Sequence, residues 1–231
     1  RVTVMRAGRV VHETAVADTS IEALATAMVG RKVLVGRQGD AARQPGEVLL
    51  QAQGLVCRDA RGVTRLHDVG LSLRAGQIVG LAGVSGNGQS ELLDLLSGLR
   101  APDAGRLRLG DSQFSAGHWL DPHTARQLGL AHVPEDRQSR ALVMSFAAWE
   151  SAVLGHEDLP AYSRRGWMRH GAMRAATADM MQRFDVRPRD PHLRSASFSG
   201  GNQQKLVLAR ELSRQPKVLL VGQPTRGVDI G

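Results

Sequence analysis

The segment GVSGNGQSELL, which begins at Gly83, has the residue types of a loop that holds phosphate. Such loops bind anions because successive backbone N–H groups point into one concavity at the start of a helix. Their glycines allow the required backbone angles and the close approach of a ligand, and a hydroxyl after them can ligate Mg²⁺. The candidate phosphate-binding residues are Gly83, Ser85, Gly86, Asn87, Gly88, Gln89, Ser90 and Glu91, and Ser90 is also the candidate metal ligand.

One position departs from the full phosphate-loop pattern GxxxxGK[ST], because Gln89 stands where that pattern has lysine. A lysine brings a full positive charge to the β- and γ-phosphates, whereas Gln89 brings only a neutral N–H donor. Loss of a charged hydrogen bond predicts that nucleotide binding is weakened roughly 10- to 100-fold. On these residues alone, the segment fits either a phosphate loop or a tight turn between a strand and a helix.

The elements that would position this loop follow from the spacing of apolar residues. The run GQIVGLAG, residues 76–83, predicts a short buried strand that leads into the loop. Helical spacing of leucines predicts a helix after the loop, with an apolar face formed by Leu92, Leu93, Leu95, Leu96 and Leu99. The same criteria predict further strands over 48–57, 65–74, 105–111, 128–133 and 217–222. They predict a helix near 122–128 and a mainly helical region over 145–194. A last helix is predicted over 200–215, with an apolar face formed by Leu206, Leu208, Ala209 and Leu212. This alternation predicts an α/β fold with a parallel core sheet and a helical insertion.

The N-terminal residues predict a separate small unit. Residues 2–13 read as a hairpin, and a helix follows that is capped by Thr19 or Ser20 and ends at Gly30. The polar segment over residues 36–47 is rich in glycine, proline and alanine-arginine pairs, so we expect a linker there.

Composition restricts the class of protein. Cys57 is the single cysteine, which excludes an internal disulfide and favours a reducing compartment. The sequence has no apolar run of the ~20 residues needed to span a bilayer, so any contact with a membrane is expected to be peripheral. The net charge of +8 would suit a protein that binds nucleic acid. Arginine supplies nearly all of the positive charge, however, and GC-rich coding sequences tend to produce such a bias without any such function. Aromatic residues are only 3%, so side chains that could stack on bases are scarce. The densest basic stretch, SRRGWMRHGAMR, is expected to be helical and either solvated or partner-facing.

The stretch FSGGNQQKLVLARELSRQPKVLLVGQPTRGVD, from Phe198 to Asp229, closely resembles the signature, Walker B and D-loop segments of ATP-binding cassette (ABC) proteins. More narrowly, it resembles the second cassette of the two-cassette ATPase subunit of sugar and nucleoside importers. The segment HVPEDR, which contains Glu135, resembles the variant Q-loop region of that family. The resemblance covers nearly the whole chain. It implies a P-loop NTPase ABC cassette with a mostly parallel core sheet, an antiparallel β subdomain and a helical subdomain.

The same resemblance implies a division of the chain into parts. Residues 1–35 would be the tail of a preceding cassette, 36–47 the linker, and 48–231 the second nucleotide-binding domain, with its helical subdomain at about 145–200. This domain is expected to be incomplete at its C-terminus, because the family continues past the D-loop into a strand and a switch histidine.

Several positions matched by the resemblance lack the residues that hydrolysis needs. Gly222 and Gln223 fall at the Walker B aspartate and the catalytic glutamate, Glu135 at the Q-loop glutamine, and Asp229 in the D-loop. Gly222 cannot help to hold a metal, and neutral Gln223 cannot act as a general base for water. Together with Gln89, these losses predict that the cassette's own site does not hydrolyse ATP and holds Mg²⁺ weakly or not at all.

The signature segment keeps its functional residue types. A serine hydroxyl and glycine N–H groups at the start of a helix form an anion site in their own right. By the resemblance, these residues would complete the ATP site of the opposite cassette: Ser199, Gly200, Gly201, Asn202 and Gln203. The same residues would also suit a helix that is simply capped after a turn and binds no ligand.

The resemblance therefore implies an ATP-binding domain of an ABC importer that couples ATP binding and hydrolysis to uptake of a sugar or nucleoside. Its partners would be another cassette, transmembrane permease subunits that contact the helical region and, indirectly, a solute-binding protein, with no nucleic acid. Its location would be cytoplasmic, peripheral at the inner face of a bacterial plasma membrane. Whether this chain alone is an enzyme stays open. Two alternatives also stay open: a non-hydrolytic regulatory module, and a basic, nucleic-acid-associated ABC-type protein.

Overall fold

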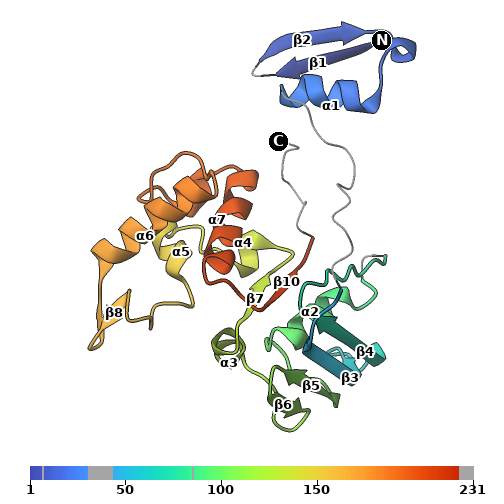
Figure 1. The fold of residues 1–231 in the computed structure, drawn as a ribbon, viewed down its shortest axis with the longest axis vertical. Coiled ribbons are helices and arrows are strands. Elements are labelled where there is room, and N and C mark those ends of the chain that lie inside the picture. Colours follow the sequence, from blue (N-terminus) through green and yellow to red (C-terminus); the bar gives the residue numbers. More distant parts are fainter. Residues whose placement is uncertain (7, 31–43, 85, 224–231) are drawn as a thin grey trace. The chain divides into compact units, whose positions relative to one another are not determined.

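The computed structural model describes residues 1–6, 8–30, 44–84 and 86–223 (Figure 1). The chain divides into two compact units, a small N-terminal one and a larger one that begins at Gln44. In the described residues, no helix is both long enough and apolar enough to cross a membrane.

The N-terminal unit is a hairpin packed against one helix. Strands β1 (Val2–Arg6) and β2 (Arg9–Thr14) pair antiparallel, and α1 (Ile21–Val29) lies against them. The hydroxyl of Ser20 accepts a backbone N–H at the start of α1, and Gly30 ends the helix in the left-handed conformation with φ 81°. The predicted hairpin and the glycine stop are therefore confirmed, and of the two candidate caps, Thr19 and Ser20, the helix uses Ser20.

A four-stranded antiparallel sheet forms the first layer of the larger unit. It contains β3 (Val48–Arg58), β4 (Thr64–Arg74), β5 (Ala104–Leu109) and β6 (Ser112–Ser115), in the order β4-β3-β5-β6. Fully buried residues alternate with half-buried ones along much of β3, as expected for a sheet with one face on a core.

Helix α2 (Gln89–Leu96) packs its buried leucines beneath this sheet. The helix α3 (Pro122–Gln127) leads into β7 (Leu130–Val133), which pairs in parallel with β10 (Val218–Val221). These are the only parallel strands within the described residues. The first core draws on all of these elements, with Leu50, Leu55, Leu95, Leu107, Leu130 and Leu220 among its buried residues.

The second core lies among helices. It is formed mainly by α5 (Ala148–Val153), α6 (His170–Arg183) and α7 (Gly200–Leu212), which Figure 1 shows gathered together. Ala141 and Leu142, which directly follow the short helix α4 (Arg137–Arg140), also belong to this core. Two one-turn 3₁₀ helices, Val16–Asp18 and Ser195–Ser197, complete the helical content of the described residues.

A buried arginine of α7 ties these helices to one another. The guanidinium of Arg210 lies 2.8 Å from the carboxylate of Glu211, and both side chains are under 10% exposed. The same guanidinium donates to the main-chain carbonyl oxygens of Ala141 and Ser151, at 2.8 and 3.1 Å. Because two of its donors reach Ala141 and Ser151 outside α7, Arg210 fixes how α7 sits against those two segments.

Three sequence-based expectations were wrong. The run before the glycine loop forms no strand: residues 77–84 adopt no regular secondary structure and are exposed, with Ile78 98% exposed. An apolar run becomes a strand only where neighbouring strands offer hydrogen-bond partners, and no described strand pairs with residues 77–84.

The second error concerns two leucines that were predicted on apolar helix faces. Leu99 and Leu212 are 51% and 36% exposed, because α2 ends at Leu96 and Leu212 is the last residue of α7.

The third error concerns the basic stretch that was expected to be helical. Its first half forms a hairpin of two short strands, β8 (Ser163–Arg164) and β9 (Trp167–Met168), and α6 begins only at His170. The two residues between the strands, Arg165 and Gly166, both have positive φ, which makes the turn.

Candidate functional site

The glycine loop runs directly into the first turn of α2. Gly86 and Gly88 have φ values of 89° and 95°, a region that side chains other than glycine rarely adopt. A Cβ at Gly88 would also lie 2.7 Å from the main-chain oxygen of Arg65, so this position has no room for a side chain. Of the predicted loop residues, Ser85 lies outside the described residues.

The side chain of Gln89 folds back over the loop. Its Nε2 donates to the carbonyl oxygen of Val84 at 3.1 Å, and it lies where a side chain on Gly83 would have to go. The amide donor that was predicted to replace a lysine is therefore used inside the loop itself.

The hydroxyl of Ser90 meets a carboxylate from another element. Ser90 Oγ donates to Glu135 Oε2 at 3.0 Å, and Glu135 follows β7 by two residues. Gly222 follows β10 directly, and its N–H donates to the carbonyl oxygen of Val133 at 2.9 Å. The carboxyl ends of these parallel strands thus bring Glu135 and Gly222 to the glycine loop, the usual position of a ligand site in such folds.

Gly222 provides the space that the side chain of Glu135 occupies. A Cβ at position 222 would lie 2.5 Å from Glu135 Cγ, 2.9 Å from the backbone nitrogen of Glu135 and 3.1 Å from Leu93 Cδ1. The next residue, Gln223, has φ 44° and brings no charge. Asp229, the predicted D-loop residue, lies outside the described residues. Within the described residues, no group of three or more His, Cys, Asp or Glu side chains is arranged to hold a metal ion.

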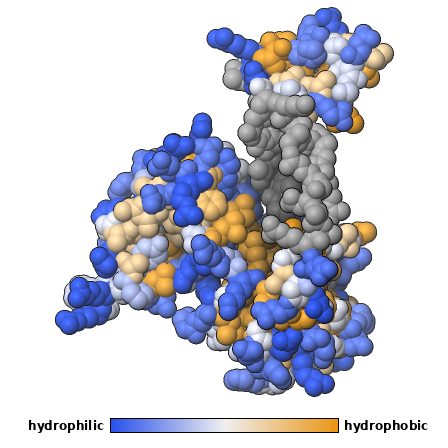
Figure 2. Space-filling model, viewed as in Figure 1, coloured by the Kyte–Doolittle hydropathy of each residue, from blue (hydrophilic) through white to orange (hydrophobic). Residues whose placement is uncertain are grey.

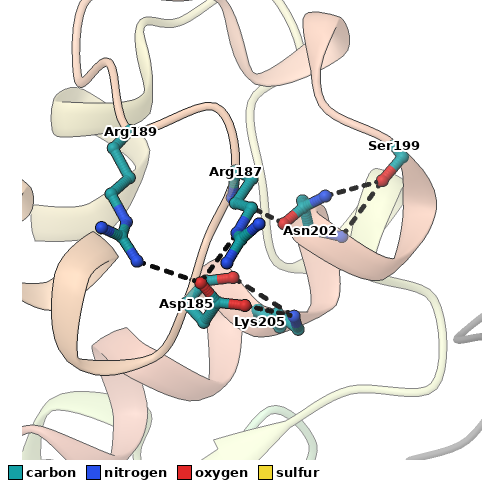
Figure 3. A network of polar contacts seen from close by, with 6 residues as sticks. All are labelled: Asp185, Arg187, Arg189, Ser199, Asn202 and Lys205. Atoms are coloured by element: carbon teal, nitrogen blue, oxygen red, sulfur yellow. Dashed lines mark hydrogen bonds and ion pairs between the residues drawn. The ribbon is translucent and has the colours of Figure 1, made fainter. Parts of the chain in front are cut away.

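The predicted signature turn sits at the start of α7 (Figure 3). Ser199 is the N-cap of this 13-residue helix, and its Oγ accepts from the amide Nδ2 of Asn202 at 2.9 Å and from the backbone N–H of Asn202 at 3.5 Å. Gly200 and Gly201 form the first turn, so their N–H groups lie at the positive end of the helix dipole. Since Ser199 Oγ accepts both of these bonds, its own proton is oriented by them and can be donated elsewhere.

A network that the sequence did not predict holds Asn202 in place. The backbone N–H of Arg187 donates to Asn202 Oδ1 at 2.7 Å. The carboxylate of Asp185 binds Arg187 and Arg189 at 2.9 and 3.1 Å and lies 3.7 Å from the ammonium of Lys205 (Figure 3). The hydrogen bond from Arg187 and the other cations lower the pKa of Asp185, which keeps it ionised. The spacing of arginines after this aspartate, DVRPR, was the available signal.

Gln203, predicted to lie with the ligand-binding residues, has a buried side chain. Its Nε2 donates to the carbonyl oxygens of Ser195 and Phe198 at 3.2 and 3.0 Å, and its Oε1 accepts from Gln138 Nε2 at 3.1 Å. In this geometry Gln203 fixes the start of α7 against α4, which follows Glu135 in the chain.

Comparison with known sequences places these features in a family. A family model described as ABC transporter matches residues 66–226. The chain is 39% identical over its full length to the guanosine import ATP-binding protein NupO of Bacillus subtilis and covers 44% of that protein. It is 36% identical to the nucleoside import ATP-binding protein NupA of Lactococcus lactis, again over 100% of the chain and 45% of that protein. The ribose import ATP-binding protein RbsA of Chromobacterium violaceum is also 36% identical, over 100% of the chain and 44% of that protein. The chain thus spans less than half the length of these relatives.

Solved structures show the same fold. The ADP conformation of MJ1267, an ATP-binding cassette of an ABC transporter, has a TM-score of 0.61 at 17% identity, over 79% of this chain and 71% of that one. The ATP-binding cassette MJ0796, in a dimeric post-hydrolysis state bound to ADP and Pi, has a TM-score of 0.63 at 22% identity, over 78% and 76%. The predicted fold class is confirmed.

Proposed function

The chain belongs to the ABC transporter family, and from this premise we propose that it is an ATP-binding part of an importer for a sugar or a nucleoside. Its relatives are named as import proteins for guanosine, nucleosides and ribose, which supports this solute class. Its partners would be a second cassette, permease subunits in the membrane and, through them, a solute-binding protein. The dimeric cassette of similar fold supports the pairing with a second cassette. A permease partner would hold the chain at the cytoplasmic face of the plasma membrane.

The cassette's own ATP site is proposed to be hydrolysis-deficient. The observation that carries this proposal is how the glycine loop uses its polar groups: Gln89 donates to Val84, and the hydroxyl of Ser90 donates to Glu135. Transfer of a phosphoryl group needs positive charge at the β- and γ-phosphates, and attack by water needs a base. Gln89 supplies no such charge and Gln223 no such base. Mg²⁺ would be held weakly, because position 222 offers no side chain at all.

Nucleotide binding is proposed to persist in weak form. The left-handed glycines and the first turn of α2 still present backbone N–H groups around the loop, and these need no side chain to attract phosphate. Gln89 and Glu135 would have to move away from the loop when a nucleotide enters.

The signature turn is proposed to act on ATP held by the opposite cassette. Ser199 is fixed by Asn202, which is in turn fixed by the main chain at Arg187, so its hydroxyl is oriented before any ligand arrives. Donors that are held in place stabilise developing negative charge without a reorganisation cost during the reaction. ATP bound by the partner would supply the phosphates, and Ser199 with the N–H groups at the start of α7 would contact them.

A nucleotide titration tests the proposal for the chain's own site. We expect Gln89→Lys to tighten binding of Mg-ATP by roughly 10- to 100-fold, because it restores one charged hydrogen bond. Gln113→Lys, which adds the same charge at an exposed position on β6, is the matched control and should leave the affinity unchanged. Equal affinity of the native chain and Gln89→Lys, or steady ATP hydrolysis by the native chain alone, would contradict the proposal.

A further inference from the structure

A basic stretch of the helical part has no role in the proposed nucleotide chemistry. Residues 159–178 contain no aspartate or glutamate, and they carry Arg164, Arg165, Arg169 and Arg174. Figure 2 shows the hairpin formed by β8 and β9 as a hydrophilic lobe that projects from the helical part of the larger unit. A stretch of one charge sign on a projecting element is a candidate contact surface.

The hairpin has a defined shape. Its turn residues, Arg165 and Gly166, have φ values of 52° and 80°, the two positive values that a type I′ turn requires. The turn positions favour Asn or Gly, so an arginine in the left-handed region is unfavourable for the backbone. Below the turn, the N–H of Arg169 donates to the carbonyl oxygen of Tyr162 at 2.8 Å, which closes the base of the hairpin. An unfavourable arginine in a closed turn suggests that its charge serves a purpose other than folding.

Large apolar side chains on the hairpin are exposed as well. Trp167 is 81% exposed and Met168 is 48% exposed, and Trp167 lies directly across the strands from Arg164. The other tryptophans have partners: Trp119 donates its indole N–H to a main-chain carbonyl at 3.0 Å, and Trp149 packs against a histidine ring. An indole left in water gains nothing for the stability of the chain, so its exposure points to a contact outside the chain.

We propose that the β8–β9 hairpin binds the surface of an anionic lipid bilayer, with Trp167 at the level of the headgroups and the neighbouring arginines on lipid phosphates. Indole rings favour the membrane–water interface, where the apolar ring and the polar N–H both find suitable surroundings. Guanidinium groups bind phosphate through paired hydrogen bonds, and each cation near an anionic surface adds to the attraction. The choice of a membrane over other acidic partners rests on the proposed function, which holds this chain next to a permease.

Vesicle binding by the 231-residue chain tests this inference. The probe is flotation with vesicles of phosphatidylcholine alone and with vesicles that contain about one third phosphatidylglycerol, at low and high salt. We expect binding to the anionic vesicles only, weakened by salt, with a blue shift of tryptophan emission. Arg164→Gln with Arg165→Gln should weaken partitioning about 20- to 30-fold. Trp167→Ala should remove the blue shift.

The matched control removes the same charge from another surface. Arg61→Gln with Arg106→Gln neutralises two exposed arginines, one in the turn between β3 and β4 and one on β5, and should leave vesicle binding within about twofold of the native chain. Circular dichroism of all variants checks that each one folds.

Three results would overturn the proposal: no binding to anionic vesicles, equal loss in the hairpin and control variants, or tighter hairpin-dependent binding to a single-stranded oligonucleotide than to vesicles. The lipid assay uses no nucleotide. If the chain does not bind anionic vesicles but Gln89→Lys still tightens nucleotide binding as expected, the membrane inference is therefore wrong and the proposed function is unaffected.

Discussion

Replacement of Gly222 by alanine adds a single methyl group at the point where β10, β7 and the glycine loop meet. The added Cβ would lie 2.5 Å from Glu135 Cγ and 2.9 Å from the backbone nitrogen of Glu135. The side chain of Glu135 can rotate away, but its backbone nitrogen lies just after β7 and cannot move without disturbing that strand. Alanine at this position must therefore displace both the side chain and part of the main chain.

The expected destabilisation follows from overpacking. Extra atoms in a closely packed region cost about 1–3 kcal/mol, and we expect Gly222→Ala to fall in this range. Gly222→Asp should cost about 1 kcal/mol more, because it places a second carboxylate beside the half-buried Glu135. The aspartate that the family pattern has at this position therefore cannot be restored by one substitution.

Urea unfolding followed by circular dichroism measures these differences. Glu135→Ala should reduce the cost of Gly222→Ala by about 1 kcal/mol, because one of the two close contacts is removed. Gly171→Ala is the control: a Cβ there meets no atom within 4 Å inside helix α6, so it should be neutral or stabilising by up to about 1 kcal/mol. A change in stability of less than about 0.5 kcal/mol for Gly222→Ala, or the same cost with and without the Glu135 side chain, would contradict this expectation.

Three further predictions concern other parts of the larger unit. Asn202→Ala should lower the free energy of unfolding by about 1–2 kcal/mol, since the amide loses its bonds to Ser199 and to the main chain; an unchanged thermal unfolding curve would contradict this. Arg210→Met should cost about 3–5 kcal/mol in guanidinium unfolding by leaving Glu211 buried without its cation, and adding Glu211→Gln should recover much of that loss. Burial lowers the pKa of His156 to about 4, so the fold holds it neutral. Its contribution to stability is complete above the unfolded pKa of about 6.5 and is lost as the pH falls toward 4; its share of the loss in urea unfolding from pH 7 to pH 5 should be about 2 kcal/mol, and His156→Gln should lose that much less than the native chain, while the similarly buried His132 keeps its own share.

The local elements were largely predictable from the sequence. Alternation of apolar and polar residues located β3 and β4, and helical spacing located α2 and α7. The stop at Gly30 was predictable, and the cap was narrowed to Thr19 or Ser20, because each depends on the local residue type. These features depend on neighbours in the chain, so one sequence is enough to predict them.

The predictions that were wrong concern segments whose structure depends on partners elsewhere in the fold. The apolar run at 77–84 has the composition of a buried strand, but a strand also requires hydrogen-bonding neighbours, which its own sequence does not specify. The β8–β9 hairpin was missed because Arg165 takes a turn position where Asn or Gly is usual.

In the candidate site, too, the features set by local sequence were predictable and those set by tertiary contacts were not. The glycines at 86 and 88 were predicted from their pattern, and both have the left-handed backbone that such a loop uses. The contact of Ser90 with Glu135, 45 positions away in the chain, could not be inferred from spacing. The room that Gly222 leaves for Glu135 is likewise a tertiary property.

The proposed role of the signature turn is tested by ATP turnover of a two-cassette protein that contains this chain. Ser199→Arg fills the signature turn with a large cation, whereas Ser197→Arg places the same side chain two residues earlier, at an exposed position. If the signature turn completes the ATP site of the opposite cassette, Ser199→Arg should lower turnover on the order of 100-fold and Ser197→Arg should leave it nearly unchanged. Full turnover with Ser199→Arg would contradict the account.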